Sequence, residues 1–291
     1  MSSKKVFDLS KWNAIINYSI LAKDCDAVIL RVGYRGASSG KVELDPTFDK
    51  NAKAFKNLDT PIGVYFFSTA ITTKEAEEEA KFCMDNIKRL GITIQFPIFI
   101  DTEYCNTNHN GRSDNLTKST RTDVVKAFIE YCRKNGYESA IYASESWFKS
   151  MLIYDNIKSY KKWVAKYSTT KPTLDNMIGW QYTSKGTSSG AKGVLDVSEY
   201  YATISASYAK YSTSTKKEKV KFINGQTVKC NNTPLYSSSI SSTVVSKKTG
   251  TYYIWSDIKK NNRIRITTDP KYVGDTSKVT GWVNINDIVI Y

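Results

Sequence analysis

Two carboxylates, Asp101 and Glu103, stand one residue apart at the end of the apolar run IFIDTE, residues 98–103. Side chains alternate along a β-strand, so both acids are predicted to point to one face, with Cα atoms roughly 6.5–7 Å apart. Two carboxyl groups held side by side cannot ionise independently, and one pKa tends to rise. A protonated carboxyl beside an ionised one can break a glycosidic bond, whereas the simpler alternative is a strand that ends in solvent.

The composition excludes much other chemistry. The chain has one histidine, His109, in a polar loop, so a His-rich zinc hydrolase is excluded and a Ser-His-Asp or Cys-His enzyme would have to use that residue. The five cysteines are odd in number and lack C-x-x-C spacing, which predicts neither a disulfide framework nor a zinc site. We therefore expect carboxylates as acid and base, with no metal and no cofactor.

These acids need a scaffold, and the first two thirds of the chain supply a repeating one. Helical patterns at 45–55, 72–91 and 119–136 separate several apolar, β-branched runs. Strands that alternate with helices predict a mostly parallel sheet, and eight strands predict an irregular TIM-like (β/α) barrel, an α/β fold. The eight runs are residues 6–10, 27–34, 62–68, 96–103, 139–144, 162–168, 178–184 and 193–200.

The acids are expected to meet at one mouth of this barrel, because chemistry in such folds lies at the C-terminal ends of the strands. Asp8, Asp101, Glu103 and Asp196 fall near the ends of the first, fourth and eighth strands. The first and eighth strands are neighbours in a closed barrel, which predicts that Asp8 lies close to Asp196. Arg31 lies within an apolar run, and a buried arginine needs an acid partner, which the mouth would supply.

Aromatic residues follow the same pattern. Each ring alone is more simply explained as core, but rings grouped at strand ends around acids are predicted to form sugar-stacking walls. The rings are Tyr65, Tyr142, Trp163, Tyr167, Trp180 and Tyr182.

The end of the chain differs in composition from the rest. Residues 205–219 are mostly Ser, Thr and Lys, which predicts an exposed linker between a first domain, 1–204, and a second, 220–291. The second domain alternates short β-like pieces with turn residues, which predicts a small all-β barrel. From Lys210 to Tyr291 the chain has 14 Lys and Arg against 5 Asp and Glu, a large share of a net charge of +14. This charge predicts a polyanionic partner, and the excess of Lys over Arg favours phosphate attraction over reading of nucleic-acid bases.

Residues 4–204 resemble the lysozymes of glycoside hydrolase family 25, N-acetylmuramidases that cut bacterial peptidoglycan. Each matching motif alone is weak evidence for the family, but the whole set in this order along the chain is specific for it. Asn13, Phe66 and Ser198 depart from the family pattern, and Phe66 is expected to alter contacts with the saccharide. The matching pieces are Asp8-Leu9-Ser10 with Trp12, Arg31-Val32-Gly33, Asp45 with Phe48 and Asn51, Gly63-Val64-Tyr65, Asp101-Thr102-Glu103, Tyr142, Trp163-Val164-Ala165, Trp180-Gln181-Tyr182 and Asp196.

The resemblance implies a role for each matching residue. Glu103 would be the general acid, and Asp101 would stay ionised, either to stabilise the oxocarbenium-like centre or to orient the N-acetyl group of the substrate. A retaining, an inverting and a substrate-assisted course all stay open. The catalytic network and the substrate-binding residues would be Asp8, Asp196, Arg31, Tyr65, Tyr142, Trp163, Trp180, Gln181 and Tyr182.

The second domain more loosely resembles bacterial Src-homology-3-like cell-wall-binding domains, through TYYIWSDI and GWVNINDI, and its predicted wall-binding residues are Trp255 and Trp282. The implied partners are peptidoglycan and anionic wall polymers, with no nucleic acid and no membrane span. A muramidase followed by a wall-binding domain resembles a phage endolysin or an autolysin, and the start of the chain has no recognisable secretory signal, which favours an endolysin that waits in the cytoplasm for holin-type release. The oligomeric state is not indicated.

Three alternative functions fit the sequence less well. A family 18-type chitinase would need an acid at position 99, where Phe99 stands. An inactive wall-binding protein would be signalled by loss of Asp101 or Glu103, and both are present. A nucleic-acid-binding protein explains the charge but leaves the four acids without a role.

Overall fold

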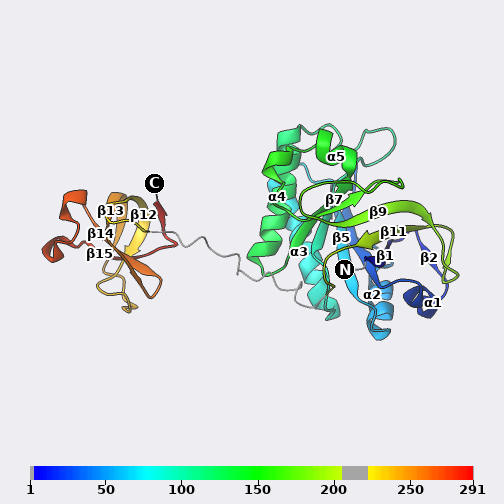
Figure 1. Ribbon diagram of the computed structural model, residues 1–291, viewed down its shortest axis with the longest axis horizontal. Helices are drawn as coiled ribbons and strands as arrows, with labels where there is room; N and C mark the ends of the chain where they lie inside the picture. Colours follow the sequence, from blue (N-terminus) through cyan, green and yellow to red (C-terminus); the bar gives the residue numbers. More distant parts are fainter. Residues whose placement is uncertain (1–2, 205–221, 291) are drawn as a thin grey trace. The chain divides into compact units, whose positions relative to one another are not determined.

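The computed structural model describes residues 3–204 and 222–290, and the chain groups into two compact units, Met1–Thr213 and Ser214–Tyr291 (Figure 1). The division between the units falls within the predicted linker, 205–219, which itself lies outside the described residues.

Eight strands of the first unit close into a barrel, as predicted. Six neighbouring pairs are parallel, from β1–β3 through β8–β9, and β11 closes the ring between β9 and β1. A short strand, β4 (Val42–Leu44), extends the sheet beyond β3, and β2 (Ala14–Ile15) pairs with β10 (Ala191–Lys192) outside it. The barrel strands are β1 (Lys4–Leu9), β3 (Ala27–Arg35), β5 (Ile62–Phe67), β6 (Ile98–Asp101), β7 (Ser139–Ser144), β8 (Lys162–Ala165), β9 (Met177–Gly186) and β11 (Leu195–Tyr200).

The last barrel strand runs opposite to the expected direction. β11 is antiparallel to both of its neighbours, so its N-terminal end lies at the mouth that the C-terminal ends of the parallel strands form. Asp196 is the second residue of β11 and reaches the mouth for this reason, so the prediction that it lies near the C-terminal end of the eighth strand was wrong. The sequence holds the cause: residues 187–194 are too few for a parallel crossover, which needs a dozen or more.

Helices cover the outside of the barrel (Figure 1). Helix α3 begins where its sequence predicts, since the Thr72 hydroxyl accepts a hydrogen bond from the Glu75 amide at 3.2 Å, and it ends at Gly91 with a left-handed φ of 55°. Helix α4 begins slightly earlier than predicted because Thr117 is its N-cap. The helices are α1 (Tyr18–Lys23), α2 (Phe48–Asn57), α3 (Thr73–Leu90), α4 (Lys118–Lys134) and α5 (Glu145–Ser150), with a 3-10 turn η1 (Tyr154–Asn156).

Alternation along the strands gives the first unit two cores. Outward side chains such as Phe7 and Val64 pack against the helices. Inward side chains such as Ile29, Phe99 and Trp163 fill the interior of the barrel. The barrel therefore has a packed floor, and only its mouth can hold a ligand.

The second unit is a five-stranded antiparallel sheet in the order β15-β14-β13-β12-β16. Asn261 and Asn262 both have positive φ, which fits the tight two-residue turn between β13 and β14. A bridge between Tyr236 and Trp282 brings the end of β12 back to β15, around one apolar core. The elements are β12 (Thr227–Leu235), β13 (Ser246–Lys260), β14 (Arg263–Thr267), η3 (Pro270–Tyr272), η4 (Thr276–Lys278), β15 (Gly281–Asn284) and β16 (Ile288–Ile290).

Candidate active site

A cavity of about 520 Å³ opens at the mouth of the barrel, and all four predicted acids line it. Asp8 and Asp196 are directly opposite each other in the register of β1 and β11, so the predicted closeness of these two residues is confirmed. Asp101 is the last residue of β6, and Glu103 follows it by two positions. The other predicted site residues in the cavity lining are Arg31, Tyr65, Tyr142, Trp163 and Gln181.

Burial raises the pKa values of all four acids, and repulsion from a neighbouring acid adds to the rise for Asp8, Asp101 and Glu103. For Asp8, burial is the main cause and the charge of Asp196 adds to it, so the pKa lies well above its usual range. Burial likewise raises the pKa of Glu103 to about 7, with a further contribution from Asp196. A carboxyl that exchanges its proton near neutral pH has the property that general acid catalysis requires.

Asp101 differs from Glu103 in having a positive charge nearby. Burial and the charge of Glu103 raise the pKa of Asp101 well above its usual range, and the Arg31 guanidinium opposes this rise. A proton on Glu103 removes the repulsion that it exerts on Asp101, so a single proton shared by the two acids is favoured on Glu103, the acid without a cation beside it. Among the described residues, Asp101 Oδ1 and Arg31 Nη2 are buried without a hydrogen-bond partner, which leaves one acceptor and one donor for a substrate.

Gln181 ties three other residues of the cavity together. Its Oε1 accepts hydrogen bonds from the hydroxyls of Tyr142, at 2.8 Å, and Tyr167, at 3.0 Å. These two donors fix the orientation of the amide, so Nε2 faces Asp8 and donates to Oδ2 at 2.9 Å. The amide thereby holds one carboxylate of the site in place and partly offsets the rise in its pKa.

The sequence predicted that Arg31 pairs with an acid of the mouth, but its partner is Asp45, which lies outside the cavity. Its Nε donates to Asp45 Oδ2 at 2.7 Å, and Asp45 is 0% exposed. Asp45 follows β4, which lies tightly against β3: a Cβ on Gly33 would stand 2.3 Å from the Glu43 carbonyl oxygen. Glycine at this position therefore allows the approach that brings Asp45 to Arg31.

Trp163 forms the aromatic floor of the cavity. Its ring contacts those of Phe99, Tyr142 and Tyr65 at centroid distances of 5.1, 4.4 and 6.4 Å. Its Nε1 donates to the Ser198 hydroxyl at 2.9 Å. Phe99 thus occupies the barrel interior below Asp101, and Ser198 orients the indole.

Three residues predicted to contact the saccharide do not line the cavity. On β9, Gln181 points inward, so its neighbours Trp180 and Tyr182 point outward by alternation, with ring centroids 5.7 Å apart. Phe66 points outward from β5 and packs against Phe82 at 6.1 Å. These three rings therefore lie outside the four-acid cavity, and their contact with the saccharide stays a prediction.

The cavity also contains residues outside the predicted site set. Trp12 is 78% exposed at the rim, with the Lys11 ammonium 5.0 Å from its ring centre. Tyr34 lies between Lys11 and Arg31, and Tyr104 stands on the opposite loop. The sequence signal that could have identified Trp12 as a rim residue was its position, three residues after the end of the strand that carries Asp8.

A second cavity, of about 360 Å³, adjoins the first. The two share Glu103, Tyr142 and Tyr167, and the second is completed by residues after β7 and β8, among them Glu145 and Lys166. Lys166 pairs with Glu145 at 3.1 Å. Glu103 therefore stands where two adjoining spaces meet.

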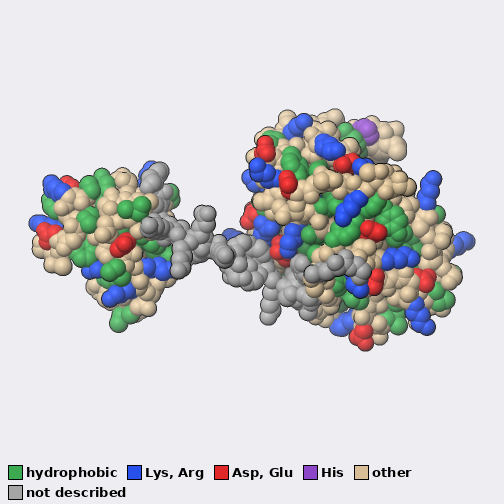
Figure 2. Space-filling model, viewed as in Figure 1, with side chains coloured by type: hydrophobic (Ala, Val, Ile, Leu, Met, Phe, Trp, Pro, Cys, Tyr) green, Lys and Arg blue, Asp and Glu red, His purple; other side chains and the backbone are tan. Residues whose placement is uncertain are grey.

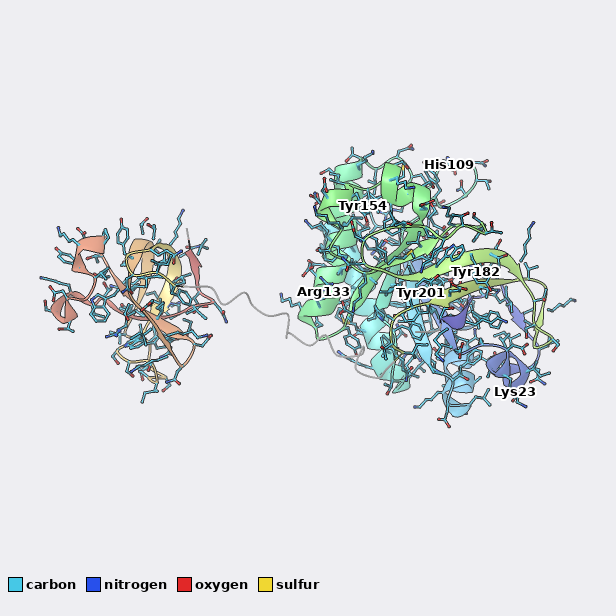
Figure 3. The ribbon with its side chains drawn as sticks, viewed as in Figure 1. Lys23, His109, Arg133, Tyr154, Tyr182 and Tyr201 are labelled. Atoms are coloured by element: carbon cyan, nitrogen blue, oxygen red, sulfur yellow. The ribbon has the colours of Figure 1, made fainter. Side chains whose placement is uncertain are left out.

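His109 lies outside this site. Its ring stacks on Tyr104 at 3.7 Å, at the end of a loop beside α5 (Figure 3). Within residues 3–204 and 222–290, no three His, Cys, Asp or Glu side chains are arranged to hold a metal ion. Over the same residues, no helix combines the length and apolar character needed to cross a bilayer.

The two predicted wall-binding tryptophans lie in the second unit. Trp255 is 6% exposed and donates from Nε1 to the Asp275 carbonyl at 2.9 Å. Trp282 is partly exposed on β15. Arg265 lies over both rings.

Comparison with known proteins gives consistent matches to the first unit. The sequence model of glycosyl hydrolases family 25 matches residues 7–191. The autolytic lysozyme of Clostridium acetobutylicum is 26% identical over 172 residues, which cover 59% of this chain and 49% of that protein. This chain therefore spans about half the length of that curated relative.

Solved structures agree with the sequence matches. The modular autolysin LytC from Streptococcus pneumoniae, solved with a synthetic peptidoglycan ligand, is 28% identical, with a TM-score of 0.61 over 68% of this chain and 47% of that chain. The bacterial lysozyme from Streptomyces coelicolor is 18% identical, with a TM-score of 0.59 over 72% of this chain and 98% of that chain, and shares the fold.

Proposed function

The chain belongs to glycosyl hydrolases family 25, and from this premise we propose that it cleaves the β-1,4 bond between N-acetylmuramic acid and N-acetylglucosamine in bacterial peptidoglycan. The observation that carries the proposal is the barrel mouth with four acids, where the pKa of Glu103 is raised to about 7. Two of the relatives are named a lysozyme and an autolysin, which supports the same reaction class.

In this mechanism Glu103 protonates the leaving glycosidic oxygen as its bond to the sugar carbon breaks, and a water molecule finally forms the new bond to that carbon and gives up a proton to a carboxylate of the site. Asp101, next to Arg31, remains ionised and either stabilises the positive charge that develops at the sugar carbon or holds the N-acetyl group that does so. Asp8 and Asp196 face each other on the opposite wall, where Gln181 holds Asp8 in place, and these two acids bind the N-acetyl sugar. The scissile bond lies beside Glu103, so one sugar occupies the four-acid cavity and the leaving sugar enters the adjoining one.

The chitinase alternative is disfavoured by the placement of Phe99. Its ring packs on Trp163 inside the barrel, where the chitinase-type motif would require a third acid. Phe66 lies outside the four-acid cavity, and an altered saccharide preference at that residue stays a prediction.

The second unit is proposed to be a Src-homology-3-like domain that binds the cell wall. Its support is a five-stranded antiparallel sheet with one core and an excess of basic residues. Release of the protein from the cytoplasm to the wall by a holin-type pore is part of the same proposal, and fractionation of producing cells tests it.

Glu103→Gln tests the catalytic proposal. General acid catalysis typically contributes 10²–10⁴-fold, so turnover of peptidoglycan should fall by about that factor while circular dichroism stays unchanged. Glu77→Gln, the same change at an exposed position of α3, is the matched control and should retain full activity. A Glu103→Gln variant that keeps half its turnover would place the acid role elsewhere.

A further inference from the structure

Two arginines lie two residues apart on the outward face of β14, and they differ in their partners. Ile264, between them, points into the core. Arg263 makes three hydrogen bonds within the fold: its Nη1 donates to the carbonyls of Ser238 and Ser241, at 3.0 and 2.7 Å, and its Nε donates to Asn284 Oδ1 at 3.0 Å. Arg263 therefore has a structural explanation, as the residue that anchors the loop after β12.

Arg265 has no such partners. Its guanidinium carbon lies 3.9 Å from the ring centre of Trp255 and 5.2 Å from that of Trp282. Across the described part of the chain its guanidinium makes no hydrogen bond and no ion pair, and its Nε is buried without a partner. The positive charge of Arg265 therefore makes cation–π contacts with two indole rings, and no acid among the described residues neutralises it.

The two rings are themselves fixed in place. The Trp255 indole is anchored by its hydrogen bond to the Asp275 carbonyl. Trp282 exchanges two backbone hydrogen bonds with Tyr236, at 2.8 and 2.9 Å. Arg265 and Trp282 remain partly exposed, so the group is held rigidly and is still open to solvent.

This arrangement leaves the two outer amino groups of the guanidinium, Nη1 and Nη2, available as donors, while Nε is buried. Stacking on aromatic rings uses the faces of the guanidinium plane, whereas its N–H groups donate within the plane. A planar fork of free donors matches the paired oxygens of a phosphate or a carboxylate. Lys and Arg side chains also recur over the visible surface of this unit (Figure 2), so an anion would approach a favourable field.

We propose that Arg265, held between Trp255 and Trp282, is a binding site for an oxyanion of the bacterial cell wall, either the phosphodiester of a wall polymer or a carboxylate of peptidoglycan. This inference rests on the proposed function, because it takes the wall as the partner. In this proposal the Arg265 guanidinium binds the oxyanion, and the buried Trp255 ring holds the guanidinium in place by stacking on it.

Wall binding by the full-length chain tests the proposal. Pelleting with purified walls is measured in a Glu103→Gln background, so that the walls stay intact. Arg265→Met should weaken binding by at least about tenfold, and Arg265→Lys should weaken it as well, because lysine keeps the charge but lacks the fork. Lys259→Met removes one positive charge from an exposed position of the same unit and is the matched control, with less than about a threefold effect.

Chemical treatment of the walls separates the two oxyanions. Hydrofluoric acid strips phosphodiester polymers and leaves peptidoglycan carboxylates. A difference between Arg265→Met and the parent chain that disappears on stripped walls assigns a phosphate, and one that persists assigns a carboxylate. Equal binding of Arg265→Met and Lys259→Met to intact walls would overturn the site.

A measurement on the unmutated chain guards against a folding defect. The Nε–Hε resonance of Arg265, assigned by its loss in Arg265→Lys, should shift when glycerol phosphate or N-acetylmuramic acid is added, and no shift with either probe counts against the site. Cleavage of soluble muropeptide oligomers should be unaffected by Arg265→Met. Failure to cleave them at all would refute the proposed function, while the binding experiments would still report on Arg265.

Discussion

Replacing Glu103 by glutamine is predicted to stabilise the first unit while it removes activity. Burial and the charge of Asp196 raise the pKa of Glu103 from 4.5 to about 7. A carboxyl with a higher pKa in the folded chain binds its proton more tightly there, so its contribution to stability is full below about pH 4.5 and is lost as pH rises through about 7. At pH 8 the buried carboxylate therefore lowers the stability of the wild type, and a neutral amide of the same shape does not.

The size of the effect follows from the shift in pKa. A difference of about 2.5 units, at about 1.4 kcal/mol for each unit, gives about 3 kcal/mol at pH 8. For a unit of about 200 residues this corresponds to a rise in Tm of roughly 6–12 °C. At pH 5 the folded wild type keeps its proton on Glu103, so most of the gain should disappear.

Calorimetry at pH 5 and pH 8 measures this prediction. The larger unit gives the transition with the larger enthalpy, because unfolding enthalpy scales with size. Glu145→Gln is the matched control, since hydrogen bonds from Lys149 and then Lys166 lower the pKa of Glu145, and its loss should destabilise the chain at pH 8. An equal gain for Glu103→Gln at both pH values would refute the account of a carboxyl that titrates near neutrality.

Three further predictions address other parts of the molecule. Asp45→Asn leaves Arg31 buried without a counter-charge and should cost about 3–5 kcal/mol, and an unchanged Tm would contradict the importance of that pair. Residues 220–291 expressed alone should fold and pellet with purified walls without cutting them, and a tail left in the supernatant would oppose a wall-binding role. Raising salt shortens the Debye length from about 10 Å at 0.1 M to about 3 Å at 1 M, so activity on intact cells should fall while cleavage of soluble oligomers changes much less. Equal loss on both substrates would mean that salt acts on the first unit.

Strand periodicity predicted the barrel and the meeting of the acids, because both depend on local pattern and on the closure of eight strands. The closeness of Asp8 and Asp196 followed from the closure of the barrel alone, although the predicted direction of the eighth strand, β11, was wrong. The short connection at 187–194 already favoured an antiparallel pair. Strict use of alternation would likewise have excluded Trp180 and Tyr182 once Gln181 was placed inside.

Other features of the site depend on tertiary contacts that no local pattern encodes. Asp45 looked like the start of a helix, and its pairing with Arg31 arises only because β4 folds back tightly against β3. The bonds from Tyr142 and Tyr167 to Gln181 join residues that are far apart along the chain, through rotamers that packing selects. Sequence thus indicated which residues gather at the mouth, and packing determined how they bond.

Mass spectrometry of digested peptidoglycan tests the central claim most directly. Purified walls are digested with the full-length protein, the new reducing ends are reduced with borohydride, and the released fragments are sequenced. The proposed function predicts reduced muramic acid at the new ends, absent from a parallel digest with Glu103→Gln. Reduced glucosamine at those ends, or free peptides without new sugar ends, would contradict it.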